Sequence, residues 1–394
     1  MEEVVIVDSM RTGLAKAYRG SLNLTRSEDM VAHLIDVLLE RNSAVAVSEI
    51  EDVVLGLAQH VGEQGDNLAR LAVLRSCLPV TTAAASINRF CSSGVQAIAY
   101  AANQIRSGQT HVALAGGVES ISMYARQEAG SYEKNPHLLR EKPEIYMEMG
   151  KTAEVVAQRY GISREIQDEY ALQSQQRYAN AASAGWIKEE IAPMTAVMKL
   201  VDKETGEERQ IETIVDRDEC NRPETTFDGL SSLRPVFDEA GSVTAGNSSQ
   251  LADGASMTLL MSAKRASQLG LEPLGIFRGL TVAGCEPDEM GIGPIFSVPK
   301  LLKNCGLAVS DIDLWELNEA FASQCVYCRD KLEIDNEIFN VNGGSISIGH
   351  PFGMTGSRST GHILRELRRR GKKLGVVTMC IGGGQGASAL VEAV

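Results

Sequence analysis

The chain has 394 residues, of which 44% are hydrophobic and 23% charged, an ordinary composition for a globular protein of one large domain or two. Its net charge of −13 argues against a nucleic-acid partner, because proteins that bind nucleic acid present a basic surface. No apolar run reaches membrane-spanning length, and the eight cysteines follow no regular spacing. We therefore expect a soluble, cytoplasmic protein with reduced thiols and no membrane partner.

The first half of the chain alternates predicted strands with predicted helices. Residues 4–7 predict a buried strand, the turn-rich residues 8–13 follow, and a helical pattern covers residues 27–40. Short apolar strands are expected at residues 53–57 and 111–115, the second ending in two glycines. This alternation favours an α/β fold with a largely parallel sheet covered by helices.

A helix expected at residues 92–107 gives one cysteine a special position. Its apolar residues recur at three- and four-residue spacing, and Gly108 supplies a stop signal just past its end. Cys91 therefore lies at or just before the helix N-terminus, where the macrodipole favours a negative charge and lowers the pKa of a thiol. Cys91 is a candidate nucleophile, and a buried structural cysteine explains the position about equally well on this evidence alone.

The region from about residue 121 to 250 differs from the rest. It contains two expected helices at residues 148–160 and 163–184, the second with Ser163 as its N-cap. The polar residues 199–219 are expected to form a loop or a β-hairpin. Ligands of open α/β folds bind beyond the carboxyl ends of the strands, so this region could cover a substrate.

The pattern of the first half returns near the C-terminus. Residues 309–314 resemble residues 47–52 at an offset of 262. A helix expected at residues 357–370 ends at Gly371, 263 residues after Gly108, and a strand follows it at residues 374–379. Three features in register at nearly one offset predict a duplicated α/β half.

Three stretches at predicted strand ends combine glycines with polar groups. They are Asn318-Glu319-Ala320-Phe321, Gly349-His350-Pro351-Phe352-Gly353 and Cys380-Ile381-Gly382-Gly383-Gly384-Gln385-Gly386. At the same offset, His350 falls in the copy of the loop that carries Cys91, so the two loops are expected on one rim. His350 could raise the reactivity of a thiol with a pKa near neutrality, and the glycines offer N–H groups to an oxyanion.

Structural interpretations of these stretches stay open at this point. His350 could be a structural residue of a glycine-rich turn, Cys380 could belong to the core, and Asn318 could cap the helix that follows. The third stretch does not match a dinucleotide-binding fingerprint. Cys325-x-x-Cys328 has redox or metal spacing but no second pair, so packing is the favoured explanation and no metal site is expected.

The motifs together resemble those of the thiolase family of acyl-CoA acyltransferases, from one end of the chain to the other. Three further matching stretches are Asn88-Arg89-Phe90-Cys91-Ser92-Ser93-Gly94, Gly246-Asn247-Ser248-Ser249 and Asn340-Val341-Asn342-Gly343-Gly344. The resemblance implies a five-layered, duplicated α/β fold with an N-terminal half at residues 1–270 and a C-terminal half at 271–394. A covering loop domain of about residues 121–250 would be inserted into the first half.

The resemblance also implies roles for individual residues. Cys91 matches the family's nucleophile, His350 the residue that activates it and the incoming CoA thiol, and Cys380 the acid/base. Asn318 matches the asparagine that holds a water, which forms one oxyanion hole with His350. The N–H groups of Cys91 and Gly382 would form the second oxyanion hole. A soft nucleophile, oxyanion donors and an acid for the departing enolate are what cleavage of a 3-ketoacyl thioester requires.

The implied ligand is coenzyme A, as a substrate and not as a permanently bound cofactor. Ser249 matches a family residue near the pantetheine, and Arg222 aligns loosely with an arginine near the CoA phosphates. A solvated loop arginine explains Arg222 equally well. Acyl-CoA and CoA are thus the expected partners, and family membership implies a homodimer or homotetramer.

Two activities of the family are open. Short-chain biosynthetic thiolases usually carry a histidine where this chain has Glu148, which favours a degradative 3-ketoacyl-CoA thiolase of fatty-acid β-oxidation. The alternative is an acetyl-CoA C-acetyltransferase that condenses two acetyl-CoA molecules. Cys380 argues against a ketoacyl synthase, and Asn318-Glu319 with Cys380 argues against a non-thiolytic lipid carrier. A catalytically silent CoA-binding protein is the alternative from a different class.

Overall fold

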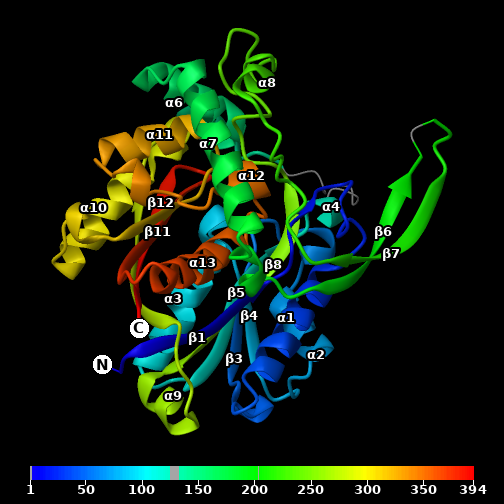
Figure 1. Cartoon of the computed structure of the whole chain (residues 1–394), viewed down its shortest axis with the longest axis vertical. Coiled ribbons are helices and arrows are strands. Elements are labelled where there is room, and N and C mark those ends of the chain that lie inside the picture. Colours follow the sequence, from blue (N-terminus) through cyan, green and yellow to red (C-terminus); the bar gives the residue numbers. More distant parts are fainter. Residues whose placement is uncertain (1, 125–132, 203) are drawn as a thin grey trace.

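Residues 2–124, 133–202 and 204–394 are described by the computed structural model (Figure 1). Within them, ten strands form one mixed sheet in the order β10-β11-β12-β9-β1-β8-β5-β3-β4, with β2 attached to β8. The strands of the first half are β1 (Val4–Arg11), β2 (Ala15–Lys16), β3 (Asp52–Gly56), β4 (Ala83–Ile87), β5 (Val112–Glu119) and β8 (Ala252–Ser262). The strands of the second half are β9 (Gly275–Gly284), β10 (Leu314–Leu317), β11 (Leu374–Ile381) and β12 (Gln385–Ala393).

The two halves of the sheet join at β1 and β9, which pair antiparallel at Val5 with Ile276 and at Ile6 with Gly275. Parallel pairing is confined to β4-β3-β5 and to β10-β11, and the other pairs are antiparallel. The expectation of a largely parallel sheet is therefore wrong. A link as short as residues 382–384, between β11 and β12, permits only an antiparallel return.

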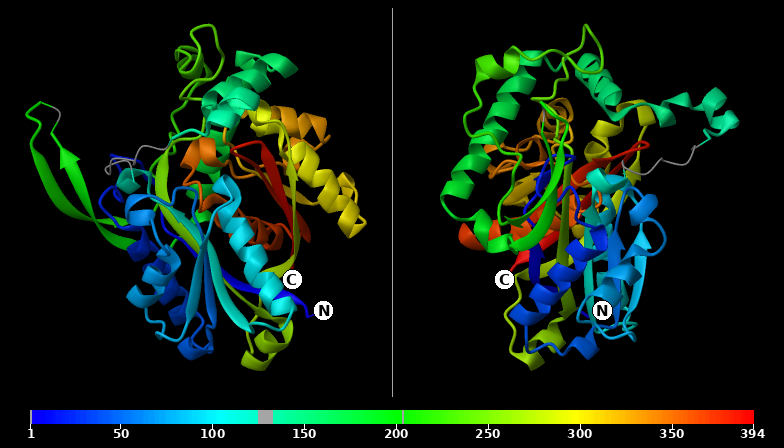
Figure 2. Two further views of the ribbon diagram at one scale, coloured as in Figure 1. Left: turned by 180° about the vertical axis from the view of Figure 1, so that it is seen from behind. Right: turned by 90° about the vertical axis from the view of Figure 1, so that its right-hand side faces the viewer.

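Helices lie on both outer faces of the sheet and between its halves (Figure 2). The outer helices of the first half are α1 (Ser27–Arg41) and α2 (Leu68–Arg75), and those of the second are α10 (Pro294–Cys305) and α11 (Ala322–Lys331). The central helices α3 (Ser93–Arg106) and α13 (Thr355–Arg369) pack against each other and share one apolar core with both halves of the sheet. The resulting order of helix, sheet, helix, sheet and helix confirms the five-layered duplicated fold.

The repeat is visible element by element. A 3₁₀ turn at Val47–Glu49 precedes β3 as one at Val309–Asp311 precedes β10. Helices α3 and α13 both end in a left-handed glycine, Gly108 and Gly371, and each is followed by a strand. The duplication expected from the sequence is thus present in the structure.

Two strands are longer than the sequence predicts. Strand β1 continues through the turn-rich residues to Arg11, because all eight of its residues are buried and all but Val7, which lies at a register shift, pair with β8. Strand β5 continues through its two glycines to Glu119. A β-carbon on Gly117 would lie 2.0 Å from the carbonyl oxygen of Gly353, so this glycine allows close packing and does not end the strand.

The region of about residues 121–250 places α6, α7 and α8 above the sheet and a hairpin that projects to one side (Figure 1). Its helices are α4 (Ile121–Tyr124), α5 (Pro136–Glu141), α6 (Met149–Tyr160), α7 (Arg164–Ser183) and α8 (Phe227–Ser231), and its strands β6 (Met194–Val201) and β7 (Glu208–Val215) form the hairpin. Ser163 caps α7 by accepting the N–H of Ile166, as predicted. The remaining short helices are α9 (Ala263–Leu269) and α12 (Ser345–Ile348). No helix among the described residues has the length and apolarity needed to cross a membrane.

Candidate active site

Cys91 lies in a tight turn at the start of α3. A 3₁₀ turn, Phe90–Ser92, leads directly into the helix. Asn88 Oδ1 accepts the N–H of Phe90 at 2.7 Å, and the Ser93 hydroxyl donates to the Phe90 carbonyl at 2.7 Å. These bonds hold Phe90 at φ +45°, a left-handed conformation that costs free energy in a residue with a β-carbon and is typical of functional turns.

The environment of Cys91 differs from the expectation of a lowered thiol pKa. Burial raises the pKa of Cys91 to about 11, and the charge of Glu119 adds to the rise. A hydrogen bond from the N–H of Gly382 opposes it without cancelling it. The helix-dipole argument neglected desolvation, which is the largest effect here. Cys91 therefore rests as a neutral thiol and needs a base before it can attack.

His350 is buried at the start of the loop that precedes α13. Its Nδ1 lies 2.6 Å from Thr355 Oγ1, and the Thr355 hydroxyl donates its own proton to the Pro351 carbonyl at 3.0 Å. Nδ1 is therefore the protonated nitrogen, and Nε2 keeps its lone pair. Burial lowers the pKa of His350 to about 3, so the expectation of a pKa near neutrality is wrong. The imidazole is neutral across the physiological range and can act as a base through Nε2.

Asn318 follows β10 and faces this free nitrogen. Its Nδ2 lies 3.1 Å from His350 Nε2, and its Oδ1 accepts the Ser345 hydroxyl at 2.6 Å, which fixes the orientation of the amide. The N-cap of α11 is Phe321 and makes no side-chain cap, so the interpretation of Asn318 as a helix cap is wrong. Asn318 instead presents an N–H donor beside the imidazole.

Cys380 lies in β11, two residues before Gly382. It is fully buried in an apolar cluster with Ala153, Met290 and Phe321. Burial raises the pKa of its thiol well above the usual value, and a thiolate at the neighbouring Cys91 would add to the rise. Cys380 is thus a second neutral thiol beside Cys91, suited to hold a proton and to release it only to a strong base.

A pocket of about 790 Å³ lies next to these groups. Arg222 and Ser249 both line it. The chain between the pocket and the buried groups is short, because the N–H of Ser249 donates to the Ala320 carbonyl at 2.9 Å and the N–H of His350 donates to the Gln250 carbonyl at 2.9 Å. The pocket therefore adjoins the chain segments that carry Asn318 and His350.

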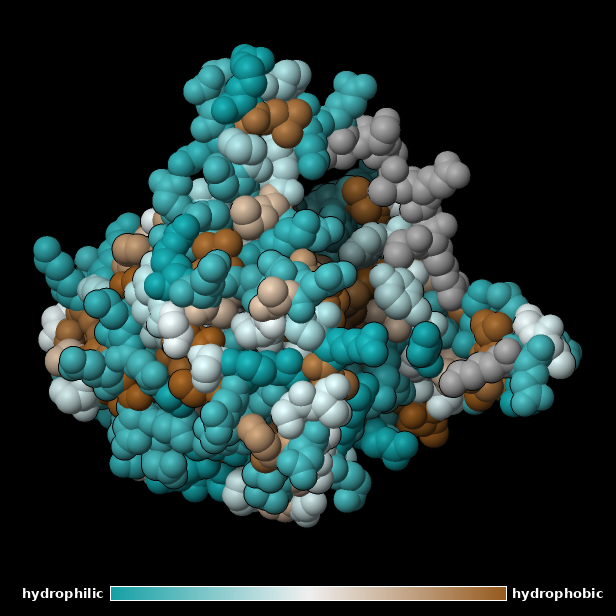
Figure 3. Space-filling view, turned by 90° about the horizontal axis from the view of Figure 1, so that it is seen from above, coloured by the Kyte–Doolittle hydropathy of each residue, from teal (hydrophilic) through white to brown (hydrophobic). Residues whose placement is uncertain are grey.

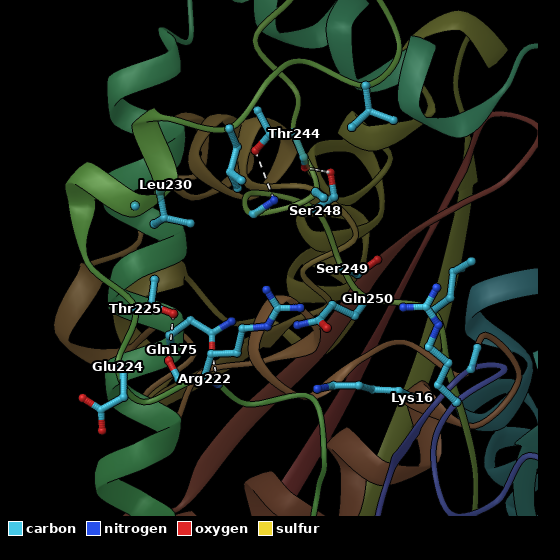
Figure 4. Close-up of a pocket in the computed structure, with 18 of the residues that line it drawn as sticks. Lys16, Gln175, Arg222, Glu224, Thr225, Leu230, Thr244, Ser248, Ser249 and Gln250 are labelled. Carbon is cyan, nitrogen blue, oxygen red and sulfur yellow. Dashed lines mark hydrogen bonds between the residues drawn. The ribbon is translucent and has the colours of Figure 1, made fainter. Parts of the chain in front are cut away.

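The charges of the pocket are mainly positive. Lys16 and Arg222 extend into it from different walls (Figure 4), and Arg19 also lines it, against a single carboxylate from Glu224. This local excess of cations contrasts with the net charge of −13 of the chain. The charges of the pocket therefore favour an anionic ligand.

Known proteins resemble this chain over its whole length. The thiolase N-terminal domain matches residues 4–264, and the thiolase C-terminal domain matches residues 271–393. The chain belongs to the thiolase family. The 3-ketoacyl-CoA thiolase of Bacillus subtilis (strain 168) is 46% identical over 395 residues, covering 100% of both chains. The peroxisomal 3-ketoacyl-CoA thiolase of Homo sapiens is 42% identical over 99% of this chain and 91% of its own.

Solved thiolase structures have the same fold. The acetyl-CoA acetyltransferase of Bacillus anthracis superimposes with a TM-score of 0.89 at 35% identity, covering 100% of this thiolase and 99% of that chain. The dimeric peroxisomal thiolase of Saccharomyces cerevisiae gives a TM-score of 0.89 at 36% identity, covering 100% and 98%. Members of the thiolase family are acyltransferases, and this chain is therefore an acyltransferase.

Sequence reasoning missed three groups of this thiolase that the structure brings to the site. Lys16 ends the short strand β2 and Arg19 lies in the turn that follows, where no local motif marks either residue, so only the fold reveals that they share the pocket with Arg222. Glu119 ends β5 beside the Cys91 loop, and its position after two glycines was the one available signal.

Cys325 and Cys328 are buried in the core around α11, and no group of three potential metal ligands occurs in the described part of the chain.

Proposed function

We propose that this thiolase cleaves a 3-ketoacyl-CoA with CoA to give acetyl-CoA and a shortened acyl-CoA through an acyl-Cys91 intermediate. One observation carries the proposal: Cys91 receives the N–H of Gly382 and lies beside the buried Cys380. The second half of the constellation is the unprotonated Nε2 of His350, which accepts the side-chain N–H of Asn318. Nucleophile, base, acid and oxyanion donors are then all available without a metal or a permanently bound cofactor.

The first half-reaction breaks a carbon–carbon bond. His350 takes the proton of the Cys91 thiol, and the thiolate attacks the ketone carbon of the substrate. The bond between the ketone carbon and the adjacent methylene carbon then breaks, and its electron pair leaves as the enolate of acetyl-CoA. Cys380 protonates this enolate, since its raised thiol pKa suits a group that must hold its proton until a carbanion develops.

The second half-reaction transfers the acyl group to CoA. Before CoA reacts, the proton that His350 took from Cys91 passes to the Cys380 thiolate, so that His350 is again a neutral base. His350 then takes the proton of the CoA thiol, whose sulfur attacks the thioester carbon of acyl-Cys91. Cys91 leaves as a thiolate and recovers this proton from His350. The N–H groups of Cys91 and Gly382 stabilise the oxyanion at Cys91, and His350 with Asn318, through a water, stabilises the enolate oxygen. Run in reverse, Cys380 removes an α-proton and the enolate condenses with an acyl-cysteine.

The degradative direction with longer chains is the favoured activity. The curated relatives at 42–46% identity carry the name 3-ketoacyl-CoA thiolase. Phe90, Ile145 and Met149 approach the bare backbone of Gly382 and Gly383, which gives the site an apolar wall. The face seen from above is hollowed, with hydrophobic side chains in the hollow (Figure 3). Acetyl-CoA C-acetyltransferase activity is the alternative, since the Bacillus anthracis protein of the same fold has that name.

Chain-length dependence tests this proposal. We expect CoA-dependent cleavage of 3-ketoacyl-CoA substrates, with kcat/KM rising from the four-carbon acetoacetyl-CoA to longer chains, because the apolar wall binds additional methylenes. Loss of the 3-ketoacyl-CoA absorbance measures the rates. Activity confined to acetoacetyl-CoA would favour the acetyltransferase. Absence of cleavage at every length would favour a silent CoA-binding protein.

We propose that the cationic pocket binds the phosphate end of CoA, with Ser249 near the pantetheine. Replacement of Lys16 by alanine should raise KM for CoA about tenfold, as expected for one lost charge-assisted phosphate contact, with little change in kcat. The matched control is Glu224→Gln, which removes the carboxylate of the same pocket and should leave KM unchanged or lower it. Steady-state kinetics at varied CoA decides, and an unchanged KM in Lys16→Ala would contradict this assignment.

We propose that the protein is a cytoplasmic homodimer whose copies meet at β4. This strand is an open edge of the sheet, whereas β10 at the other edge is buried and bridged by Phe339. Exposed apolar side chains surround the open edge, namely Leu71, Leu74, Val80 and Tyr100. An unpaired edge with apolar flanks favours association, and the yeast relative is described as dimeric. A monomeric mass in light scattering would contradict the dimer, and twice that of the dimer would indicate a tetramer.

We also propose that the functional units of the chain follow the repeat, with an N-terminal half at residues 1–270 and a C-terminal half at residues 271–394. Residues of about 121–250 would act as a loop domain inserted into the first half. Support comes from α6 and α7, which lie above the sheet, and from α8, which contributes Gly229 and Leu230 to the pocket.

A further inference from the structure

Glu119 is a fully buried carboxylate that links the loops of the Cys91 site. Each of its oxygens accepts two N–H groups: Oε1 from Gln59 N (3.1 Å) and Gln64 Nε2 (2.7 Å), and Oε2 from Ala58 N (2.9 Å) and Gly353 N (2.9 Å). Burial raises the pKa of Glu119 to about 7, and these donors oppose the rise. A proton on the carboxyl group would find no acceptor among them, so the contacts favour the ionised form.

The bonds of Oε2 connect the two loops that carry the nucleophile and the base. On one side, the carbonyl of Ala58 accepts the side-chain amide of Asn88 at 2.9 Å, and Asn88 holds the turn before Cys91. On the other side, Gly353 lies three residues after His350, in the turn that leads into α13. One carboxylate oxygen thus fixes the spacing between the Cys91 loop and the His350 loop.

The duplication gives this bridge a counterpart in the other half. At the offset of 263 residues, Glu119 corresponds to Gly382 and Cys91 corresponds to Met354. The end of β5 contacts the loop before α13, and the residue after β11 contacts the loop before α3. Gly382 presents an N–H donor to Cys91, and Glu119 presents a carboxylate to the N–H of Gly353. Equivalent positions of the two halves therefore carry a hydrogen-bond donor in one case and a negatively charged acceptor in the other.

The charge of Glu119 acts on the groups around it. It raises the pKa of the Cys91 thiol and contributes to the rise of the Tyr124 hydroxyl pKa to about 12. A negative charge at this place disfavours a resting thiolate and so protects the nucleophile from electrophiles and oxidants.

We propose that Glu119 is a positioning residue of the thiolytic site, which holds the Cys91 and His350 loops in register and keeps Cys91 a neutral thiol until His350 takes its proton. This inference rests on the proposed role of Cys91. The equivalent ends of β11 and β5 thus have different roles. Gly382, after β11, stabilises negative charge on the substrate, whereas Glu119, at the end of β5, disfavours negative charge on Cys91 of the free enzyme.

The test combines Glu119→Gln with alkylation and turnover. Iodoacetamide labelling of Cys91, followed by mass spectrometry from pH 6.5 to 10, reports the thiolate fraction, and steady-state thiolysis reports positioning. In Glu119→Gln we expect alkylation at pH 8 to become about tenfold faster, the change that one pKa unit gives. We expect kcat to fall at least tenfold, because small misplacements at a reacting pair have large effects, with KM for CoA unchanged. Glu119→Asp keeps the charge and should show the wild-type alkylation profile with a reduced kcat.

Glu154→Gln is the matched control, because Glu154 also accepts loop N–H groups, from Ser242 and Val243, but is not among the groups that shift Cys91. It should alter neither readout. A Glu119→Gln enzyme with the wild-type alkylation profile would overturn the proposal, even if it melts at a lower temperature. If that variant does not fold, a wild-type kcat in Glu119→Asp overturns it. Thiolysis that survives complete alkylation of Cys91 would instead refute the proposed function itself.

Discussion

Replacement of Cys91 by alanine is expected to abolish thiolysis and leave the fold intact. The side chain is small, partly exposed and not part of an apolar core cluster, so its loss creates little cavity. Loss of a covalent nucleophile should lower kcat by on the order of 10⁴- to 10⁶-fold. Incubation with a 3-ketoacyl-CoA in the absence of CoA, followed by intact-protein mass spectrometry, should show an acyl adduct on the wild type and none on Cys91→Ala.

The matched control is Cys305→Ala, which makes the same chemical change at an exposed cysteine at the end of α10. This variant should retain both the adduct and the wild-type rate. An acyl-enzyme that still forms in Cys91→Ala would refute the nucleophile assignment. Circular dichroism spectra that match the wild type would establish that the loss of activity is chemical.

Replacement of Cys380 by serine should separate the two half-reactions. Carbon–carbon cleavage needs an acid for the enolate, whereas exchange of an acyl group between acyl-CoA and labelled CoA needs only Cys91, His350 and the oxyanion donors. A serine hydroxyl is a far weaker acid than a thiol, so thiolysis should slow by about 10³-fold, within the range that general acid–base catalysis contributes. Acyl exchange should fall by less than about tenfold.

Cys328→Ser serves as the control for a buried thiol, since Cys328 is also fully buried but belongs to the core around α11. It should reduce stability without separating the two rates. Equal losses of cleavage and exchange in Cys380→Ser would mean that Cys380 is structural. Loss of exchange alone would contradict the assignment of roles between the two thiols.

The sequence predicted the duplicated architecture because its signals are local. Apolar periodicity, terminal glycines and the cap at Ser163 each depend on a few neighbouring residues, and α3, α7 and α13 lie within two residues of their expected bounds. Sheet direction was not predictable in this way. The antiparallel return of β12 onto β11 and β9 depends on tertiary pairing, which periodicity does not encode.

The electrostatics of the site could not be predicted for a similar reason. The helix dipole predicted a lowered pKa for Cys91, and His350 was expected to titrate near neutrality, whereas burial raises the pKa of Cys91 and lowers that of His350. Glu119, Lys16 and Arg19 are separated in sequence from the residues they accompany, so no spacing rule brings them together. The motifs identified the reacting side chains, and the surrounding charges required the fold.

The packing of α3 against α13 has a consequence for how the enzyme can vary. Strand pairing between the halves covers two residue pairs, so the alignment of Cys91 with His350 depends on these two helices as well as on the Glu119 bridge. A β-carbon at Gly94 would lie 2.7 Å from the carbonyl oxygen of Gly353, so even one methyl group there would wedge the two loops apart. Substitutions in the contact between α3 and α13 should therefore misalign Cys91 and His350. They should lower the reaction rate before they prevent folding, even where they lie far from the substrate.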